Sequence, residues 1–147
     1  MSIVYEPLQT EHIQEVVNLY VKNFWDFPIA FGENNADYWE SQFDESGYGV
    51  IGFDDEKIAC CYWGERQVFL YNQDYLQGAE FLWFMMPEYR TGKNFVKFLD
   101  QIEAVNRLKF VDFYQLNVTP DKIKLATNLE KYGFVKDEFK VRKHLNV

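Results

Sequence analysis

Apolar residues recur at helical spacings of three and four in several segments of the chain. In the first segment, Thr10 stands where a helix N-cap is expected, just before the first apolar residue of the stripe. In the last, Pro120 suits the first turn of a helix and Gly133 suits the C′ position that ends it. The spacing predicts helices over residues 11–24, 35–43, 94–108 and 120–131.

Shorter apolar runs, bounded by glycine, proline or paired acidic residues, predict strands between these helices. They are expected at residues 3–5, 48–53, 57–64, 67–72, 80–86, 111–118 and 139–145. The resulting order, βααββββαβαβ, is typical of an α/β domain with one mixed central sheet flanked by helices. A chain of 147 residues suffices for one core and not for two, so residues 1–147 are expected to form a single domain.

Composition excludes several classes of protein. The chain is 48% apolar and 19% aromatic, which argues against disorder. It has neither an apolar run of membrane-spanning length nor a secretion signal, so a cytoplasmic protein that does not bind membrane is expected. Cys60 and Cys61 are neighbours on a predicted strand, point to opposite faces and are expected to be reduced. His12 and His144 lack partners at ligand spacing, so no metal site is expected.

Charge is divided unevenly along the chain. The net charge is −8, but residues 1–87 hold three basic against fifteen acidic residues, whereas residues 88–147 hold twelve basic against eight acidic ones. An acidic surface argues against nucleic-acid binding. The division fits a basic site for one anionic ligand beside an acidic site for a cationic one, although a solvated acidic surface with no partner explains the composition equally well.

The segment 80–97, EFLWFMMPEYRTGKNFVK, combines a buried strand, a proline, a basic turn and the start of a helix. Such a turn directs consecutive backbone N–H groups, with the helix dipole behind them, at one point in space. Arg90, Lys93 and Lys97 add positive charge there. The arrangement favours an anion, most often a phosphate.

The segments MMPEYRTGK and LEKYGF, together with the N-terminal helix pair, resemble the GCN5-related N-acetyltransferases, the GNAT superfamily, over nearly the whole chain. In departing from the family motif at two positions of the turn, the chain resembles phage-encoded members of the family. The resemblance implies acetyl-CoA as cosubstrate and a cationic primary amine as acceptor: a protein lysine or N-terminus, a polyamine or an amino sugar. It places the diphosphate at Arg90, Thr91, Gly92, Lys93, Asn94 and Phe95, and a strand-like pantetheine edge at Phe84, Met85 and Met86.

Two positions of the family turn depart from its pattern of small residues, because Lys93 and Phe95 stand where glycine or alanine is usual. Small residues there let backbone approach phosphate without a side chain between them. Gly92 supplies such room one position earlier, and Phe95 fits if its ring turns into the core, as its place in the apolar stripe indicates.

The resemblance also suggests catalytic residues. Glu80 opens the key strand where some family members carry their general base, and apolar neighbours would raise its pKa. The usual general-acid tyrosine falls on Leu129, which has no proton to give. Tyr114 is the substitute we consider, although a half-buried sheet aromatic needs no such role.

Two functions from different classes are therefore compared. The first is an acetyl-CoA-dependent N-acyltransferase. The second is a catalytically silent protein of the same fold that uses an acidic, aromatic N-terminal face to bind a basic macromolecule. The sequence leaves a homodimer or a protein partner open. The acidic, aromatic N-terminal face is expected to include Tyr20, Phe24, Trp25, Phe27, Phe31 and Trp39.

Overall fold

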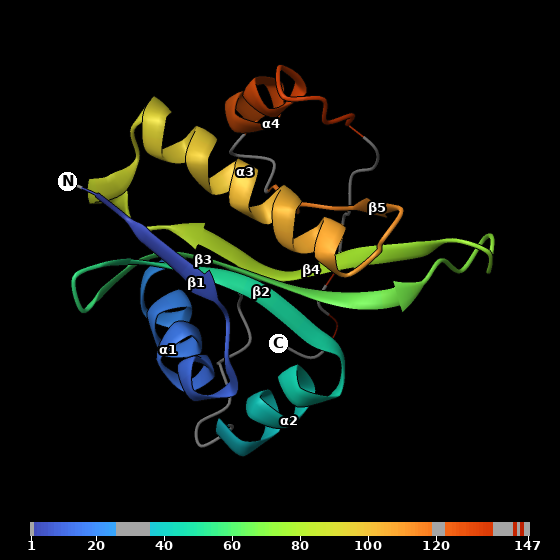
Figure 1. Cartoon of the computed structure of the whole chain (residues 1–147), viewed down its shortest axis with the longest axis horizontal. Helices are drawn as coiled ribbons and strands as arrows, with labels where there is room; N and C mark the ends of the chain where they lie inside the picture. The colour runs from blue at the N-terminus through green and yellow to red at the C-terminus, as the bar shows by residue number, and fades with distance from the viewer. Residues whose placement is uncertain (1, 26–35, 119–122, 137–142, 144, 146–147) are drawn as a thin grey trace. The chain divides into compact units, whose positions relative to one another are not determined.

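In the part of the chain that the structure describes, one sheet of five strands organises the first unit. Its strands lie in the order β1-β2-β3-β4-β5, with β1 to β4 antiparallel and β5 parallel to β4 (Figure 1). The predicted α/β fold with a mixed sheet flanked by helices is confirmed. The strands are β1 (Val4–Pro7), β2 (Gly47–Asp54), β3 (Lys57–Val68), β4 (Leu76–Met85) and β5 (Phe113–Tyr114).

The computed structural model describes residues 2–25, 36–118, 123–136, 143 and 145. It divides the chain into two compact units, Met1–Gln115 and Leu116–Val147, which are described separately. The first unit holds the sheet with η1 (Thr10–His12), α1 (Ile13–Phe24), α2 (Ala36–Ser46), η2 (Pro87–Tyr89) and α3 (Gly92–Leu108). The second holds α4 (Ile123–Glu130).

Helices cover both faces of the sheet in the first unit. Helices α1 and α2 lie on one face and α3 on the other (Figure 1). Strand alternation explains why both faces need cover: Cys61 points into the core beneath α1, whereas Cys60 points to the α3 face beside Tyr5. Both thiols are free and buried, and burial raises their pKa values, which keeps them protonated.

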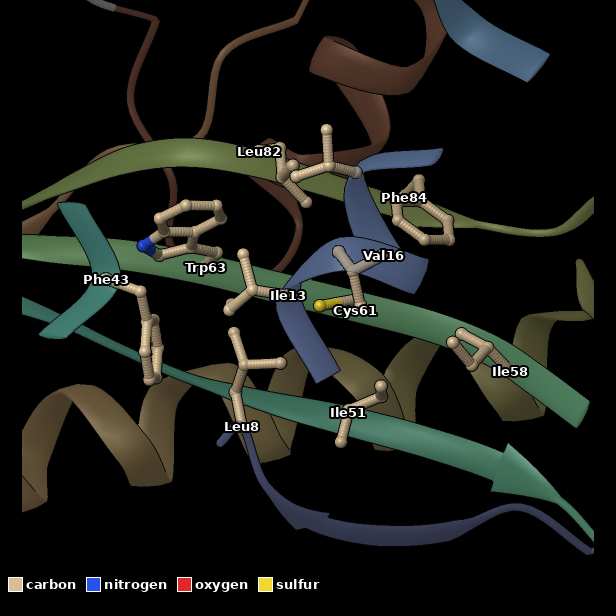
Figure 2. Close-up of a cluster of buried hydrophobic side chains, with 11 residues drawn as sticks. Leu8, Ile13, Val16, Phe43, Ile51, Ile58, Cys61, Trp63, Leu82 and Phe84 are labelled. Carbon is tan, nitrogen blue, oxygen red and sulfur yellow. The ribbon is translucent and has the colours of Figure 1, made fainter. Parts of the chain in front are cut away.

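The core on the α1 face is aliphatic at its centre and aromatic toward α2 (Figure 2). Ile13 and Val16 of α1 are fully buried, as the helical spacing predicts. Trp63 of β3 packs edge-to-face on Phe43 of α2, with ring centroids 5.8 Å apart. The buried indole N–H of Trp63 has no hydrogen-bond acceptor among the described residues.

A polar cluster lies beneath α3. The Tyr48 hydroxyl donates to Asn106 Oδ1, and Asn106 Nδ2 donates to Tyr62 Oη at 3.3 Å and to Ile102 O at 2.9 Å. Asn106 is only 2% exposed, so its amide must be satisfied internally, and this cluster does so. The cluster needs close approach to β4, because a Cβ on Gly78 would collide with both Tyr48 and Asn106.

The predicted elements need five corrections. Thr10 begins η1 and its hydroxyl donates to Asp44 of α2, so it is not the N-cap of α1. The two strands predicted at 57–64 and 67–72 are one strand, β3, which ends at Val68. Strand β4 begins at Leu76 instead of residue 80, and helix α3 begins two residues before 94.

The fifth correction concerns the strand predicted over residues 111–118. Only Phe113 and Tyr114 form a strand, flanked by bonds from Asp112 N to Leu76 O and from Gln115 N to Gly78 O. Two residues beyond Gly78, β4 carries a bulge between Glu80 and Leu82, and bulges bend a strand locally.

In the second unit, α4 ends as predicted. Gly133 has φ +92°, its N–H bonds to Glu130 O, and the Phe134 N–H bonds to Leu129 O. This is a Schellman motif with Gly133 at C′. Pro120 and most of the strand predicted at 139–145 lie outside the described residues.

Candidate active site

The basic turn, residues 87–95, follows β4 and leads into α3. Pro87 begins η2, and Thr91 in extended conformation is the N-cap of α3, where its Oγ1 accepts from Asn94 N at 3.2 Å. An α-helix leaves its first N–H groups without intrahelical partners, so those of Gly92 and Lys93 point outward from the helix start. Gly92 and Lys93 are both exposed, as an anion site requires.

The space around this turn bears on the two unusual positions. A Cβ at Gly92 would meet no atom within 4 Å, so the surface in front of it is open. The Lys93 side chain is exposed and Phe95 is half-buried, with its N–H bonded to Thr91 O at 2.9 Å. The buried apolar stripe of α3 is formed by Phe98, Leu99 and Ile102.

Arg90 lies within the basic turn and also contacts the end of β4 and helix α1. Its Nε donates to Met85 O at 2.8 Å, and its guanidinium carbon lies 5.7 Å from the centre of the Phe24 ring. A guanidinium carries five N–H donors, so this bond commits one of them and leaves others for an anion. Arg90 therefore braces the turn against the end of β4.

The outer edge of β4 separates from β5 beyond Gly78. Among the described residues, β5 pairs with β4 only through Gln77 and Gly78. Backbone groups alternate along a strand, and the Met86 N–H bonds to Ala59 O of β3. Of the three residues predicted for the pantetheine edge, Met85 thus directs its backbone outward, while Met86 directs its N–H toward β3. The buried side chain of Phe84 belongs to the core. By the same alternation Trp83 is the second residue whose backbone faces outward.

Glu80 stands beside the bulge in β4, just past the point where β4 and β5 separate. It pairs with Gly64 of β3, and after the register shift Leu82 pairs with Trp63, so Phe81 is the extra residue. The bulge directs Phe81 to the α2 face, where its ring stacks on Trp63 at 4.2 Å. Glu80 is half-buried on the α3 face.

A tyrosine hydroxyl lies next to Glu80. A Cβ on Gly64, the partner of Glu80, would lie 2.5 Å from the Tyr62 hydroxyl oxygen, so this hydroxyl sits next to the Glu80 position. The pKa of Tyr62 is raised, mainly by burial and in small part by the Glu80 carboxylate. Tyr62 therefore keeps its proton and adds no negative charge beside Glu80.

Tyr114 lies on the same face of the sheet as Glu80. It pairs with Gly78, two residues before Glu80, so the structure makes the two predicted catalytic residues diagonal neighbours. Burial raises the pKa of Tyr114 to about 12, and the Glu103 carboxylate adds to the rise. A phenol this weakly acidic is a poor proton donor to a thiolate, whose thiol has a pKa of about 8.5.

Solved structures of acetyltransferases superimpose on the whole chain. A predicted acetyltransferase from Clostridium acetobutylicum, crystallised with acetyl-CoA, aligns at 13% identity with a TM-score of 0.73, covering 97% of this chain and 96% of the other. AAC(6')-Iy, in complex with a CoA-containing bisubstrate analogue, aligns at 9% identity with a TM-score of 0.75 and full coverage of both chains. A ribosomal-protein-alanine N-acetyltransferase from Brucella melitensis aligns at 9% identity, a TM-score of 0.74 and full coverage of both. The chain has the GNAT fold.

No protein-family model and no curated protein matches the sequence itself. The TM-scores of 0.73–0.75 establish the fold. At identities of 9–13%, they do not establish the activity or the acceptor of this chain. The resemblance to phage-encoded members stays a prediction.

Sequence reasoning missed an aromatic and acidic group on the α2 face of this GNAT fold. Phe81, 37% exposed, packs edge-to-face on Trp39 at 5.3 Å and stacks on Trp63. Glu65 lies two residues from Trp63 on the same face. Its pKa is raised by burial and by the Glu45 carboxylate of α2, while a bond to Gln67 lowers it. Helix α2 carries only acidic charges: Asp37, Glu40, Asp44 and Glu45.

Alternation could have placed Trp63 and Glu65 together, but the bulge that brings in Phe81 leaves no signal in the sequence. Of the aromatic residues predicted for the N-terminal face, Phe27 and Phe31 lie outside the described residues. Tyr20 and Phe24 pack on Phe84 and so contribute to the core.

The described part of the chain shows neither a metal-binding group nor a membrane-spanning helix. No set of three or more histidine, cysteine, aspartate or glutamate side chains there is grouped to bind a metal ion. None of the helices found there combines the length and the apolar character needed to span a bilayer.

Proposed function

We propose that this protein is an acetyl-CoA-dependent N-acyltransferase that acetylates a primary amine of a cationic acceptor. The observation that carries the proposal is that the outward-facing edge of β4 is followed directly in the chain by the exposed start of helix α3. Both occur in a fold that superimposes on an acetyltransferase crystallised with acetyl-CoA. Bound acetyl-CoA would supply an activated acetyl thioester.

The proposed binding roles follow from position. The N–H groups of Gly92 and Lys93 and the side chains of Arg90 and Lys93 would neutralise the diphosphate. Thr91 and Asn94 cap the helix so that those N–H groups stay directed outward. The backbone of Met85, with that of Trp83, would offer strand-type hydrogen bonds to the pantetheine arm.

Glu80 is the proposed general base. It would accept a proton from the acceptor ammonium, so that the amine lone pair can attack the thioester carbonyl carbon and the carbon–sulfur bond can break. The sulfur leaves as a thiolate. The nitrogen loses its second proton once the carbon–nitrogen bond has formed, and the thiolate or solvent takes it up. The acceptor class, a protein amine, polyamine or amino sugar, is supported by the aromatic and acidic α2 face, because aromatic rings and carboxylates both attract cations. Glu80 lies on the opposite, α3 face, so the α2 face would hold the cationic remainder of the acceptor and not the ammonium group that reacts.

A second candidate is a catalytically silent GNAT-fold protein that binds a basic partner through the same acidic face. It is favoured by the high pKa of Tyr114, by Leu129 at the usual tyrosine position and by the side chains at Lys93 and Phe95. For either candidate we propose one domain over residues 1–147 and a cytoplasmic location.

Calorimetric titration with acetyl-CoA, followed by thiol release against a panel of amines, separates the two. Micromolar binding with turnover supports the enzyme. Binding without turnover on any amine supports the silent protein, and no binding at millimolar acetyl-CoA contradicts both a coenzyme site and the enzyme.

A further inference from the structure

Tyr89 ties the basic turn to the hairpin between β2 and β3. Its side chain is 2% exposed, and its hydroxyl donates a 2.9 Å hydrogen bond to Asp54 Oδ2 at the end of β2. Asp55 follows with φ +52°, the left-handed backbone of a tight turn. Burial raises the pKa of Tyr89, and the bond to Asp54 raises it further, so the hydroxyl keeps the proton that it donates.

The neighbouring ion pair is a weaker link between the same two segments. Lys57 Nζ lies 2.6 Å from Glu88 Oε1 and 5.8 Å from the centre of the Tyr89 ring. Both charged side chains are substantially exposed, at 62% and 42%. Exposed pairs contribute little, so the part-buried Tyr89–Asp54 bond is the main anchor.

The backbone of Tyr89 in turn holds the helix start. Its carbonyl oxygen accepts from Thr91 N at 2.8 Å and from Asn94 Nδ2 at 2.9 Å. Thr91 and Asn94 cap α3 on either side of Gly92 and Lys93. A shift of Tyr89 therefore moves the two N–H groups that point outward.

We propose that Asp54 and Tyr89 are positioning residues for the coenzyme, fixing the amides of Gly92 and Lys93 through the Tyr89 carbonyl. The inference rests on the proposed function, because it concerns the same turn. Donors that are already in place bind an anion more tightly than donors that must be ordered on binding. Asp54 would thus act on a diphosphate it does not touch.

The test compares acetyl-CoA dissociation constants, and the KM and kcat for acetyl-CoA, among Tyr89→Phe, Asp54→Ala and Asp54→Asn. We expect the first two to raise Kd and KM about tenfold with kcat nearly unchanged. Asp54→Asn keeps an oxygen acceptor for the Tyr89 hydroxyl and should restore affinity to within about twofold of the wild type.

The control is Tyr48→Phe, which also deletes a buried phenol bonded to a side chain but lies away from the turn. It should lower the melting temperature without changing the coenzyme Kd. Amide exchange at Asn94 and Phe95 adds a readout that needs no ligand, and it should accelerate in Tyr89→Phe and not in Tyr48→Phe.

If Tyr89→Phe and Asp54→Ala bind acetyl-CoA with the same Kd as the wild type, this inference is overturned and the proposed function stands. Equal losses in Asp54→Ala and Asp54→Asn also overturn it, because the acceptor oxygen would then be irrelevant. A wild type that binds no acetyl-CoA overturns the proposed function and this inference together.

Discussion

Reversing the charge of Lys93 tests the anion site at the start of α3. Lys93 is exposed and occupies the second position of the helix, where the usual family residue is small. An exposed charge pair is worth about 0.2–1 kcal/mol. Lys93→Glu replaces one attraction by one repulsion, so we expect a loss of about 1.4 kcal/mol, a tenfold weaker affinity for acetyl-CoA.

The fold itself should not suffer from this substitution. A carboxylate in the first turn interacts favourably with the helix dipole, by about 0.3–1 kcal/mol. The melting temperature of Lys93→Glu should therefore equal or exceed that of the wild type while affinity falls. The opposite signs separate a binding effect from a folding effect.

Calorimetry at two salt concentrations measures the effect, and Lys109→Glu is the matched control. Lys109 is the C-cap of α3, sixteen residues from Lys93, or about 24 Å along a helix. That distance exceeds the screening length of about 8 Å at physiological salt. Equal affinity of Lys93→Glu and the wild type at low salt would remove Lys93 from the site, and equal losses in both variants would show only a long-range charge effect.

Three further predictions concern catalysis and packing. Glu80→Gln should lower kcat by about 10²–10⁴-fold with an unchanged acetyl-CoA Kd, measured by thiol release, and an unchanged kcat would exclude Glu80 as the base. Tyr114 has its pKa raised by burial, so its contribution to the free energy of unfolding is present below pH 10 and falls as pH rises toward 12. Denaturant unfolding at pH 9 and pH 11.5 should show a smaller decrease for Tyr114→Phe than for the wild type, and equal decreases would contradict the raised pKa. Gly78→Ala should cost about 1–3 kcal/mol of stability because the added Cβ meets Tyr48, whereas Gly92→Ala meets nothing and should fold normally; equal melting temperatures for the two variants would contradict the packing argument.

The local features of the turn could be predicted from the sequence because each depends on neighbouring residues. Pro87 ends the strand, as predicted. The Thr91 cap bonds to a residue only three positions later and was open to prediction, although the helix was expected to begin at residue 94. The opposite orientations of Cys60 and Cys61 follow from strand alternation alone. Gly133 was predictable at C′ for the same reason, since only the preceding helix determines it.

Features that depend on pairing between distant segments could not be predicted. Glu65 and Arg66 are charged and separate the two strands predicted at 57–64 and 67–72, yet they continue β3 because Ala79 and Gly78 of β4 pair with them. The same pairing sets the bulge at Phe81, which re-aims one side chain toward Trp39 and Trp63. The acceptor side of the proposed site was therefore the part that the sequence described least well.

The missing general acid weighs less than the general base in this chemistry. A lysine-type ammonium has a pKa of about 10.4, so freeing its lone pair at pH 7 costs about 4.6 kcal/mol. A thiol with a pKa of about 8.5 leaves as thiolate at pH 7 for only about 2 kcal/mol. Tyr114, at a pKa of about 12, is a weaker acid than that thiol and cannot reduce this smaller cost. As the proposed base, the half-buried carboxylate of Glu80 would meet the larger cost, so Leu129 in place of tyrosine is compatible with the proposed turnover.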